Sequence, residues 1–199
     1  MAVHYFVRHG ETGWNAELRL QGQADTGMTA RGRAQAQRNG RRLAELIGSD
    51  LEDVDQRYDF VASPLWRTRE TMELIRAAMS LPVDGYRLEP CLLEVHFGAW
   101  QGSTLDEIEA RKPGATAARA ADKWGFVPPG DGAESYRMLL ERVRPWFMSL
   151  QRPTICVTHG GVIRTLFSLA GGMAVDECAV LPIPQDRILR FDDGNLQWL

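Results

Sequence analysis

Short apolar runs alternate with longer segments of helical hydrophobic period along this chain. The runs at residues 2–7, 60–62 and 154–157 are short and end at charged residues, glycine or proline, so they predict buried strands. Apolar positions at helical spacing predict helices over about 30–47, 64–79, 135–150 and 162–170. Strands that alternate with helices predict a mainly parallel sheet covered on both faces.

Capping and turn residues set the limits of several of these elements. Thr29 is a suitable N-cap for the helix over 30–47, and Gly48 stands just past its end. Pro64 fits the first turn of the second helix. Near the end of the chain, the apolar segments 188–191 and 196–198 flank the turn-forming residues 192–195, which predicts a hairpin.

The middle of the chain is less regular. Residues 88–95 are a weaker strand candidate, because Pro90 cannot occupy an interior ladder position. A short helix is expected over 104–110, and the stretch 113–132 is interpreted as a helical excursion plus a loop that overhangs a site. The fold predicted is α/β, with a three-layer arrangement in which a mainly parallel central sheet is flanked by helices on both faces. We expect a single domain over residues 1–199.

Composition narrows the classes of partner. The chain has 199 residues, 44% hydrophobic and 25% charged, with a net charge of -3, so no global positive field attracts nucleic acid or an anionic membrane. No apolar segment approaches the roughly 20 residues of a membrane span, and the first residues do not form a signal peptide. The sequence therefore predicts a cytoplasmic protein with no nucleic-acid and no membrane partner; a homodimer is left open.

Cysteine and histidine spacing gives no sign of a metal centre. Cys91, Cys156 and Cys178 are odd in number and lack the C-x-x-C spacing, which argues against a disulfide framework and a thiolate zinc site. The four histidines show no spacing typical of a common metal site. We expect neither a metal nor another cofactor.

Two histidine-glycine pairs, His9-Gly10 and His159-Gly160, directly follow predicted strands. Ligands of open α/β sheets bind at the carboxyl ends of strands, so both imidazoles are expected at one site. The other candidates near strand ends are polar or charged: Arg8, Arg67, Glu94 and Asn15. Guanidinium groups bind phosphate oxygens bidentately, a neutral imidazole is a nucleophile, and a carboxyl group can protonate a leaving oxygen. The set predicts a phosphate site.

The order of these motifs resembles that of the histidine phosphatase superfamily, which includes the cofactor-dependent phosphoglycerate mutases and many small phosphatases. The resemblance is carried by residues 8–11 and 14–15, Gln21-Gly22, and residues 28–36, 63–68, 93–94, 97–102, 129–135 and 157–161. It implies a phosphoglycerate mutase-like fold.

The resemblance also implies a role for each matching residue. His9 would be the phosphorylated nucleophile and Glu94 the proton donor to the leaving group. The groups that would bind the phosphoryl oxygens are Arg8, Arg67 and His159, with Asn15, Gln21, Gly22 and the backbone N–H of Gly160. His9 must be neutral to attack, so its other nitrogen is expected to donate to a backbone carbonyl, whereas His159 is expected to be charged.

Departures from the mutase pattern favour the phosphatase branch. Phe97 and Leu105 stand where the mutases carry a tyrosine and a lysine that hold the substrate acid, and residues 114–129 lack the adjacent arginines of the mutases. The sequence thus predicts a metal-independent phosphomonoesterase that hydrolyses a small phosphorylated metabolite through a phosphohistidine on His9. A phosphoglycerate mutase-type transfer and a catalytically weak phospho-ligand binding protein are the alternatives. His96 is the second candidate for the proton donor.

Overall fold

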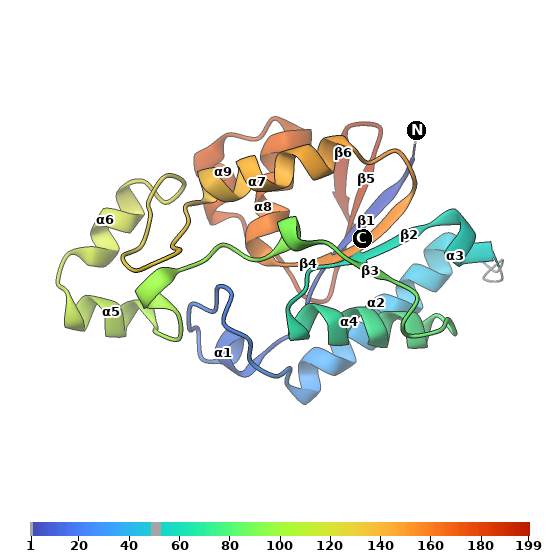
Figure 1. The fold of residues 1–199 in the computed structure, drawn as a ribbon, viewed down its shortest axis with the longest axis horizontal. Coiled ribbons are helices and arrows are strands. Elements are labelled where there is room, and N and C mark those ends of the chain that lie inside the picture. The colour runs from blue at the N-terminus through green and yellow to red at the C-terminus, as the bar shows by residue number, and fades with distance from the viewer. Residues whose placement is uncertain (1, 49–52) are drawn as a thin grey trace.

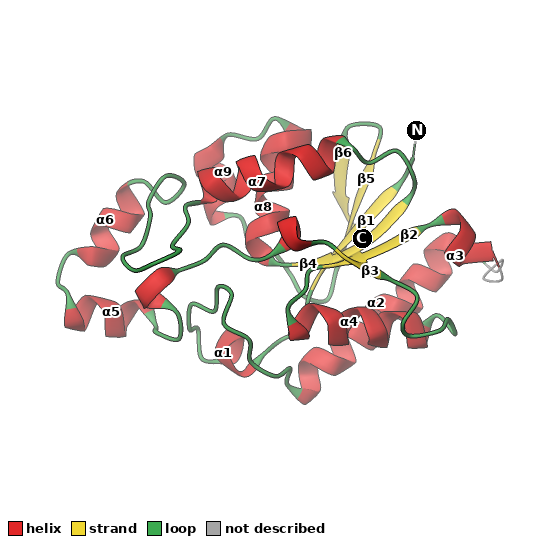
Figure 2. Cartoon of the chain, viewed as in Figure 1, coloured by secondary structure: helices red, strands yellow, loops and turns green. Residues whose placement is uncertain are grey.

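A computed structural model describes residues 2–48 and 53–199 and shows a central six-stranded sheet (Figures 1 and 2). The strands are β1 (His4–Arg8), β2 (Asp59–Ala62), β3 (Arg87–Leu88), β4 (Thr154–Thr158), β5 (Ile188–Asp192) and β6 (Asn195–Trp198), in the order β3-β2-β4-β1-β5-β6. The first four strands of that order pair in parallel, whereas β5 and β6 join the edge beside β1 in antiparallel pairs.

Alternate side chains of the strands enter two separate apolar cores. Phe6, Val61 and Cys156 pack on one face beneath α7 (Tyr136–Met148) and α8 (Gly160–Gly171). The neighbouring residues Tyr5 and Phe60 point to the opposite face, which α2 (Ala30–Ile47) and α4 (Trp66–Ala78) cover. Figure 1 shows the two helical layers on either side of the sheet. The predicted three-layer α/β fold is therefore confirmed, because a strand with both faces buried needs helices on each side.

The remaining helices are short. They are α1 (Gly13–Ala16), α3 (Val54–Arg57), α5 (Leu105–Arg111), α6 (Ala115–Ala121) and α9 (Val175–Val180), with 3₁₀ turns at Pro90–Leu92 and Gly98–Trp100. Of these helices, α9 packs beside α8, with Cys178 and Ala179 in the same core. The sequence predicted neither α1, α3 nor α9, which are too short to show a hydrophobic period. The helix α6 is the predicted excursion within 113–132 (Figure 2). No helix in the described part of the chain is long and apolar enough to cross a membrane.

Most predicted limits are confirmed, but Pro64 does not stand in the first turn of the second helix, because α4 begins at Trp66 after the N-cap Leu65. One predicted strand is also wrong. Thr29 accepts a hydrogen bond from the Gly32 N–H at the start of α2, and the hairpin turn is Asp193-Gly194, both with positive φ as in a type I′ turn. The strand expected over 88–95 is reduced to Arg87–Leu88, because Pro90 begins a 3₁₀ turn in which the Glu89 carboxylate accepts from the Cys91 N–H.

Candidate active site

A cavity of about 200 Å³ opens at the carboxyl ends of the parallel strands. Eight of the nine residues predicted for the phosphate site line it: Arg8, His9, Asn15, Gln21, Gly22, Arg67, Glu94 and Gly160. The predicted residues meet in one cavity because β1 and β4 are parallel neighbours, so the loops that follow these two strands leave the sheet side by side.

His9 is fixed in one tautomer at the end of β1. Its Nδ1 lies 2.8 Å from the Gly10 carbonyl oxygen, which can only accept, so Nδ1 carries the proton and Nε2 is free. Burial lowers the pKa of His9 well below its ordinary value, and the positive charges of Arg67 and Arg8 lower it further. The imidazole is therefore neutral at neutral pH, as the sequence predicts for a nucleophile.

His159 lies behind His9 and does not line the cavity. It is fully buried, its ring centroid is 5.3 Å from that of His9, and its Nε2 shares a hydrogen bond of 2.7 Å with Ser63 Oγ. Burial and the positive charge of Arg67 lower the pKa of His159 well below the ordinary value. The expectation that His159 is charged is wrong for this structure. Burial removes the hydration that stabilises a protonated imidazole, and the positive charges of Arg67 and Arg8 also oppose protonation.

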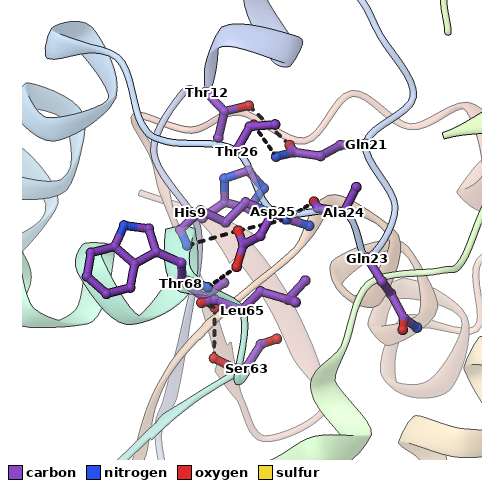
Figure 3. A network of polar contacts seen from close by, with 12 residues as sticks. His9, Thr12, Gln21, Gln23, Ala24, Asp25, Thr26, Ser63, Leu65 and Thr68 are labelled. Carbon is purple, nitrogen blue, oxygen red and sulfur yellow. Dashed lines mark hydrogen bonds and ion pairs between the residues drawn. The ribbon is translucent and has the colours of Figure 1, made fainter. Parts of the chain in front are cut away.

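Arg67 enters the site from the first turn of α4. Its guanidinium donates to the Gly22 carbonyl at 2.6 Å and to the Ala24 carbonyl at 2.8 Å, and it pairs with Asp25 at 3.3 Å. Figure 3 shows Ala24 and Asp25 in this polar network. These contacts bind the loop of residues 22–25 to the start of α4. They fix the position of the Arg67 side chain, which is fully buried.

Arg8 is the second guanidinium beside His9. It donates to the Ile183 carbonyl at 2.8 Å, and its buried Nε has no partner among the described residues. Burial lowers the pKa of Arg8 to about 10, although the carboxylate of Glu94 acts in the opposite direction. The group therefore keeps its charge at neutral pH and has a donor available for an anion.

Backbone amides hold the Glu94 carboxylate. Its Oε1 accepts from the Val95 N–H at 2.9 Å, and its Oε2 accepts from the Gly161 N–H at 3.0 Å in the first turn of α8. The alternative proton donor, His96, does not line the cavity, and its Nδ1 accepts from the Gly98 N–H at 3.0 Å. Between these two candidates, the structure brings only Glu94 to the cavity.

Asn15, Gln21 and Gly22 line the cavity, but their polar groups also hold the loops together. The Asn15 side-chain oxygen Oδ1 accepts from the Thr12 N–H and from Gln185 Nε2. The Gln21 amide bonds to the hydroxyl groups of Thr12 and Thr26, as Figure 3 shows. Gly22 has φ of +59°, and its carbonyl receives the Arg67 guanidinium.

Sequence analysis singled out Phe97 only as the counterpart of a mutase tyrosine, and it missed the other residues that line the outer part of the cavity: Arg19, Leu20, Arg119, Lys123, Tyr136 and Arg164. Arg119 and Lys123 come from the irregular stretch, which has no pattern that orients a side chain. Arg164 could have been predicted from the sequence, because it stands one helical turn after Gly160 and therefore lies on the same face of α8. In the ranges 2–48 and 53–199, no three His, Cys, Asp or Glu side chains gather as ligands for a metal ion.

Comparison with known proteins is consistent with this geometry. Residues 4–198 match the profile of the histidine phosphatase superfamily (branch 1). A probable phosphoglycerate mutase GpmB of Erwinia tasmaniensis is 31% identical over 98% of this chain and 86% of its own length. A glucosyl-3-phosphoglycerate phosphatase of Mycolicibacterium vanbaalenii is 32% identical over 88% of this chain and 76% of its own.

Solved structures show the same likeness. A mycobacterial glucosyl-3-phosphoglycerate phosphatase in complex with VO3 superposes with a TM-score of 0.77 and 27% identity, covering 100% of this chain and 97% of that one. YhfR of Bacillus stearothermophilus gives a TM-score of 0.76 and 27% identity over 100% and 95% of the two chains.

Proposed function

Because the chain belongs to branch 1 of the histidine phosphatase superfamily, whose members similar to it are phosphatases or mutases, we propose that it hydrolyses phosphate monoesters through a phosphohistidine on His9. The observation that carries the proposal is the fixed tautomer of His9. Its Nδ1 proton is held by the Gly10 carbonyl, so that the unprotonated Nε2 is available beside two guanidinium groups.

In the first step, His9 Nε2 attacks phosphorus and forms the P–N bond while the ester P–O bond breaks. The Glu94 carboxyl group gives its proton to the departing oxygen, which leaves as an alcohol. In the second step, the Glu94 carboxylate takes a proton from water as the water oxygen attacks phosphorus. The P–N bond then breaks, phosphate leaves, and His9 returns to its neutral form.

The cationic groups stabilise the charge of the transferred phosphoryl group. Arg8 and Arg67 present guanidinium donors to its oxygens, and the first turn of α8, which begins at Gly160, adds the positive end of a helix. Charge stabilisation by fixed donors needs no reorganisation during the reaction. The proposed reaction therefore uses arginines where other phosphatases use metal ions, and it is proposed to be metal-independent.

Water is the proposed acceptor of the phosphoryl group. Phe97 lines the cavity where the mutases have a tyrosine, and the corresponding lysine position is Leu105, which does not line it. The phosphatases among the similar structures support the same choice. A phosphoglycerate mutase-type transfer is the second candidate, supported by the relatives named phosphoglycerate mutase.

Single-turnover labelling tests the proposal. The enzyme is mixed with a ³²P-labelled aryl phosphate in the presence of EDTA and quenched in alkali, in which phosphohistidine is retained. We expect an alkali-stable, acid-labile label at His9, absent in His9→Gln. The matched control is His4→Gln, because His4 is also buried but does not line the cavity. Turnover without a label, or activity that is lost in EDTA and restored by a metal, would contradict the proposal.

A further inference from the structure

Glu94 lies on a segment of the chain that is neither strand nor helix. Residues 93–97 join the 3₁₀ turn at Pro90–Leu92 to the turn at Gly98–Trp100, and Figure 2 draws them as loop. The carbonyl groups of such a segment have no ladder partners, so other donors must bind them. A general acid acts only within hydrogen-bond reach of the leaving oxygen. The contacts that fix this segment therefore bear on the reaction.

The Arg142 guanidinium provides donors to this segment. Arg142 lies on α7, and its Nη1 donates to the carbonyl oxygens of Cys91 at 2.7 Å and Leu93 at 3.0 Å. Its Nη2 lies 3.4 Å from the carbonyl oxygen of Glu94 itself. These three carbonyl groups face one planar cation whose N–H groups have a fixed geometry. The segment cannot move relative to α7 without breaking several of these hydrogen bonds.

Glu134 fixes Arg142 and the other end of the segment. Its carboxylate oxygens accept from Arg142 Nε at 3.0 Å and from Nη2 at 2.8 Å, which is a bidentate pair. The His96 N–H donates to Glu134 Oε2 at 3.1 Å, and the His96 carbonyl accepts from the Glu134 N–H at 2.8 Å. Only 25% of the Arg142 side chain and 16% of the Glu134 side chain are exposed, so this pair differs from a solvated surface ion pair. The two residues together hold the chain on both sides of Glu94.

Gln23 connects the same carbonyl to the phosphoryl site. Its Nε2 donates to the Glu94 carbonyl oxygen at 3.0 Å. Gln23 belongs to the loop of residues 22–25, in which the carbonyl groups of two residues accept from Arg67. The Glu94 backbone is thus bound both to α7 and to the loop that orients a guanidinium beside His9.

A shift of the segment would carry the Glu94 carboxylate with it. One of its donors, the Val95 N–H at 2.9 Å, belongs to the segment itself. The other donor, the Gly161 N–H at 3.0 Å, belongs to α8 and would stay in place. Displacement of the segment would therefore break the Gly161 contact and turn the carboxyl group from its present position.

Arg142 has no donor left for a substrate. A guanidinium has five N–H groups, and those of Arg142 have acceptors in Glu134, twice, and in three backbone carbonyls. Arg142 also does not line the cavity, unlike Arg8 and Arg67. Any effect of Arg142 on the reaction therefore passes through the backbone that it holds.

We propose that Arg142, oriented by Glu134, is a positioning residue for the proton donor: it holds the backbone around Glu94 so that the carboxyl group stands at the leaving oxygen. The proposal depends on the proposed function, because it assumes that Glu94 protonates the leaving group. His9 and Arg8 are held by contacts of their own, with the Gly10 and Ile183 carbonyls. Loss of the Arg142 contacts should therefore impair the acid-assisted cleavage more than the attack of the nucleophile.

The leaving-group dependence of kcat/KM in Arg142→Lys and Glu134→Gln tests this role. Lysine keeps the charge of Arg142 but not its planar fork, and glutamine keeps the size of Glu134 but not the bidentate pair. The substrates are an alkyl phosphate, whose leaving oxygen needs a proton, and p-nitrophenyl phosphate, whose leaving oxygen does not. We expect the alkyl-to-aryl ratio of kcat/KM to fall about tenfold or more in Arg142→Lys, and in the same direction in Glu134→Gln. A loss of folded protein lowers both rates equally and leaves the ratio unchanged.

Two further comparisons assign the effect to Glu94. Arg144→Lys, on the same helix in an exposed pair with Glu141, should keep the wild-type ratio within about twofold. In a Glu94→Gln background, Arg142→Lys should lower the ratio no further, because no proton donor is left to misplace. A wild-type ratio in Arg142→Lys, with a lowered ratio in Glu94→Gln, would overturn the positioning role alone. An unchanged ratio in Glu94→Gln would contradict the acid step of the proposed function, and with it this role.

Discussion

The backbone N–H of Gly161 donates to Glu94 Oε2 at 3.0 Å, and the space where a Gly161 side chain would begin is occupied by the other oxygen of the same carboxylate. A Cβ on Gly161 would lie only 2.1 Å from Glu94 Oε1. The second glycine of the segment 159–161 therefore positions the proposed proton donor. Its lack of a side chain and its amide at the start of α8 both serve this contact.

Gly161→Ala should move the Glu94 carboxylate while leaving the fold intact, because the atom met first is the end of a flexible side chain. We expect kcat for alkyl phosphates to fall about tenfold or more, since a misplaced general acid loses part of a contribution of roughly 10²–10⁴. Thermal denaturation checks the fold. Gly27→Ala is the control, because nothing lies within 4 Å of a Cβ there. Equal activity of the two variants would contradict this positioning role.

Glu94→Gln should reduce hydrolysis of alkyl phosphates far more than that of activated aryl phosphates. An alkoxide must be protonated to leave, whereas a nitrophenolate departs without a proton. Because the same carboxylate would activate water in the second step, an aryl phosphate should also give a burst of phenol as the phosphoenzyme accumulates. Stopped-flow absorbance measures the burst. The same rate loss for both leaving groups, without a burst, would remove Glu94 from the acid-base role.

Arg67→Lys should not preserve activity, although it preserves the charge. A lysine cannot bind two phosphoryl oxygens and the Gly22 and Ala24 carbonyls at once. Loss of one such contact in the transition state corresponds to about a hundred- to a thousandfold in kcat. The control is Arg33→Lys, since Arg33 forms an exposed pair with Glu70. A kcat of Arg67→Lys near the wild-type value would show that this guanidinium does not contact the phosphoryl group in the transition state.

Acid should destabilise the protein through its buried imidazoles. The pKa values of His9 and His159 are held well below 6.5, so below pH 6.5 the unfolded chain binds protons that the folded protein does not. Stability is therefore present above pH 6.5 and is lost as the pH falls from there toward the folded pKa values, by up to about 1.4 kcal/mol per pH unit for each group. Urea unfolding at pH 7.5, 6 and 5 measures the slope.

His159→Gln separates this effect from the protonation of other groups. The variant has one imidazole fewer to titrate, so its unfolding free energy should decline less steeply between pH 6.5 and 5 than that of the wild type. His96→Gln, a substitution at a partly buried histidine away from the cavity, is the comparison. The same slope in His159→Gln and in the wild type would show that His159 does not contribute.

The sequence by itself determined the layers of the fold and the centre of the candidate site. Hydrophobic period and capping residues such as Thr29 act over a few positions, so α2, the hairpin and the parallel core strands could be predicted from local patterns. His9 and Glu94 could be placed in the site because the motifs around them have a fixed order along the chain.

Only the tertiary structure decided the charge of His159 and the outer wall of the cavity. The protonation of His159 depends on burial and on Arg67 and Arg8, which reach it from other segments. Arg119, Lys123 and Arg164 likewise line one cavity although they lie on α6, on the loop after it and in α8, which are far apart in the sequence. Long-range proximity of charges leaves no periodic trace in a sequence, so the way these three side chains share one cavity could be described only from the tertiary structure.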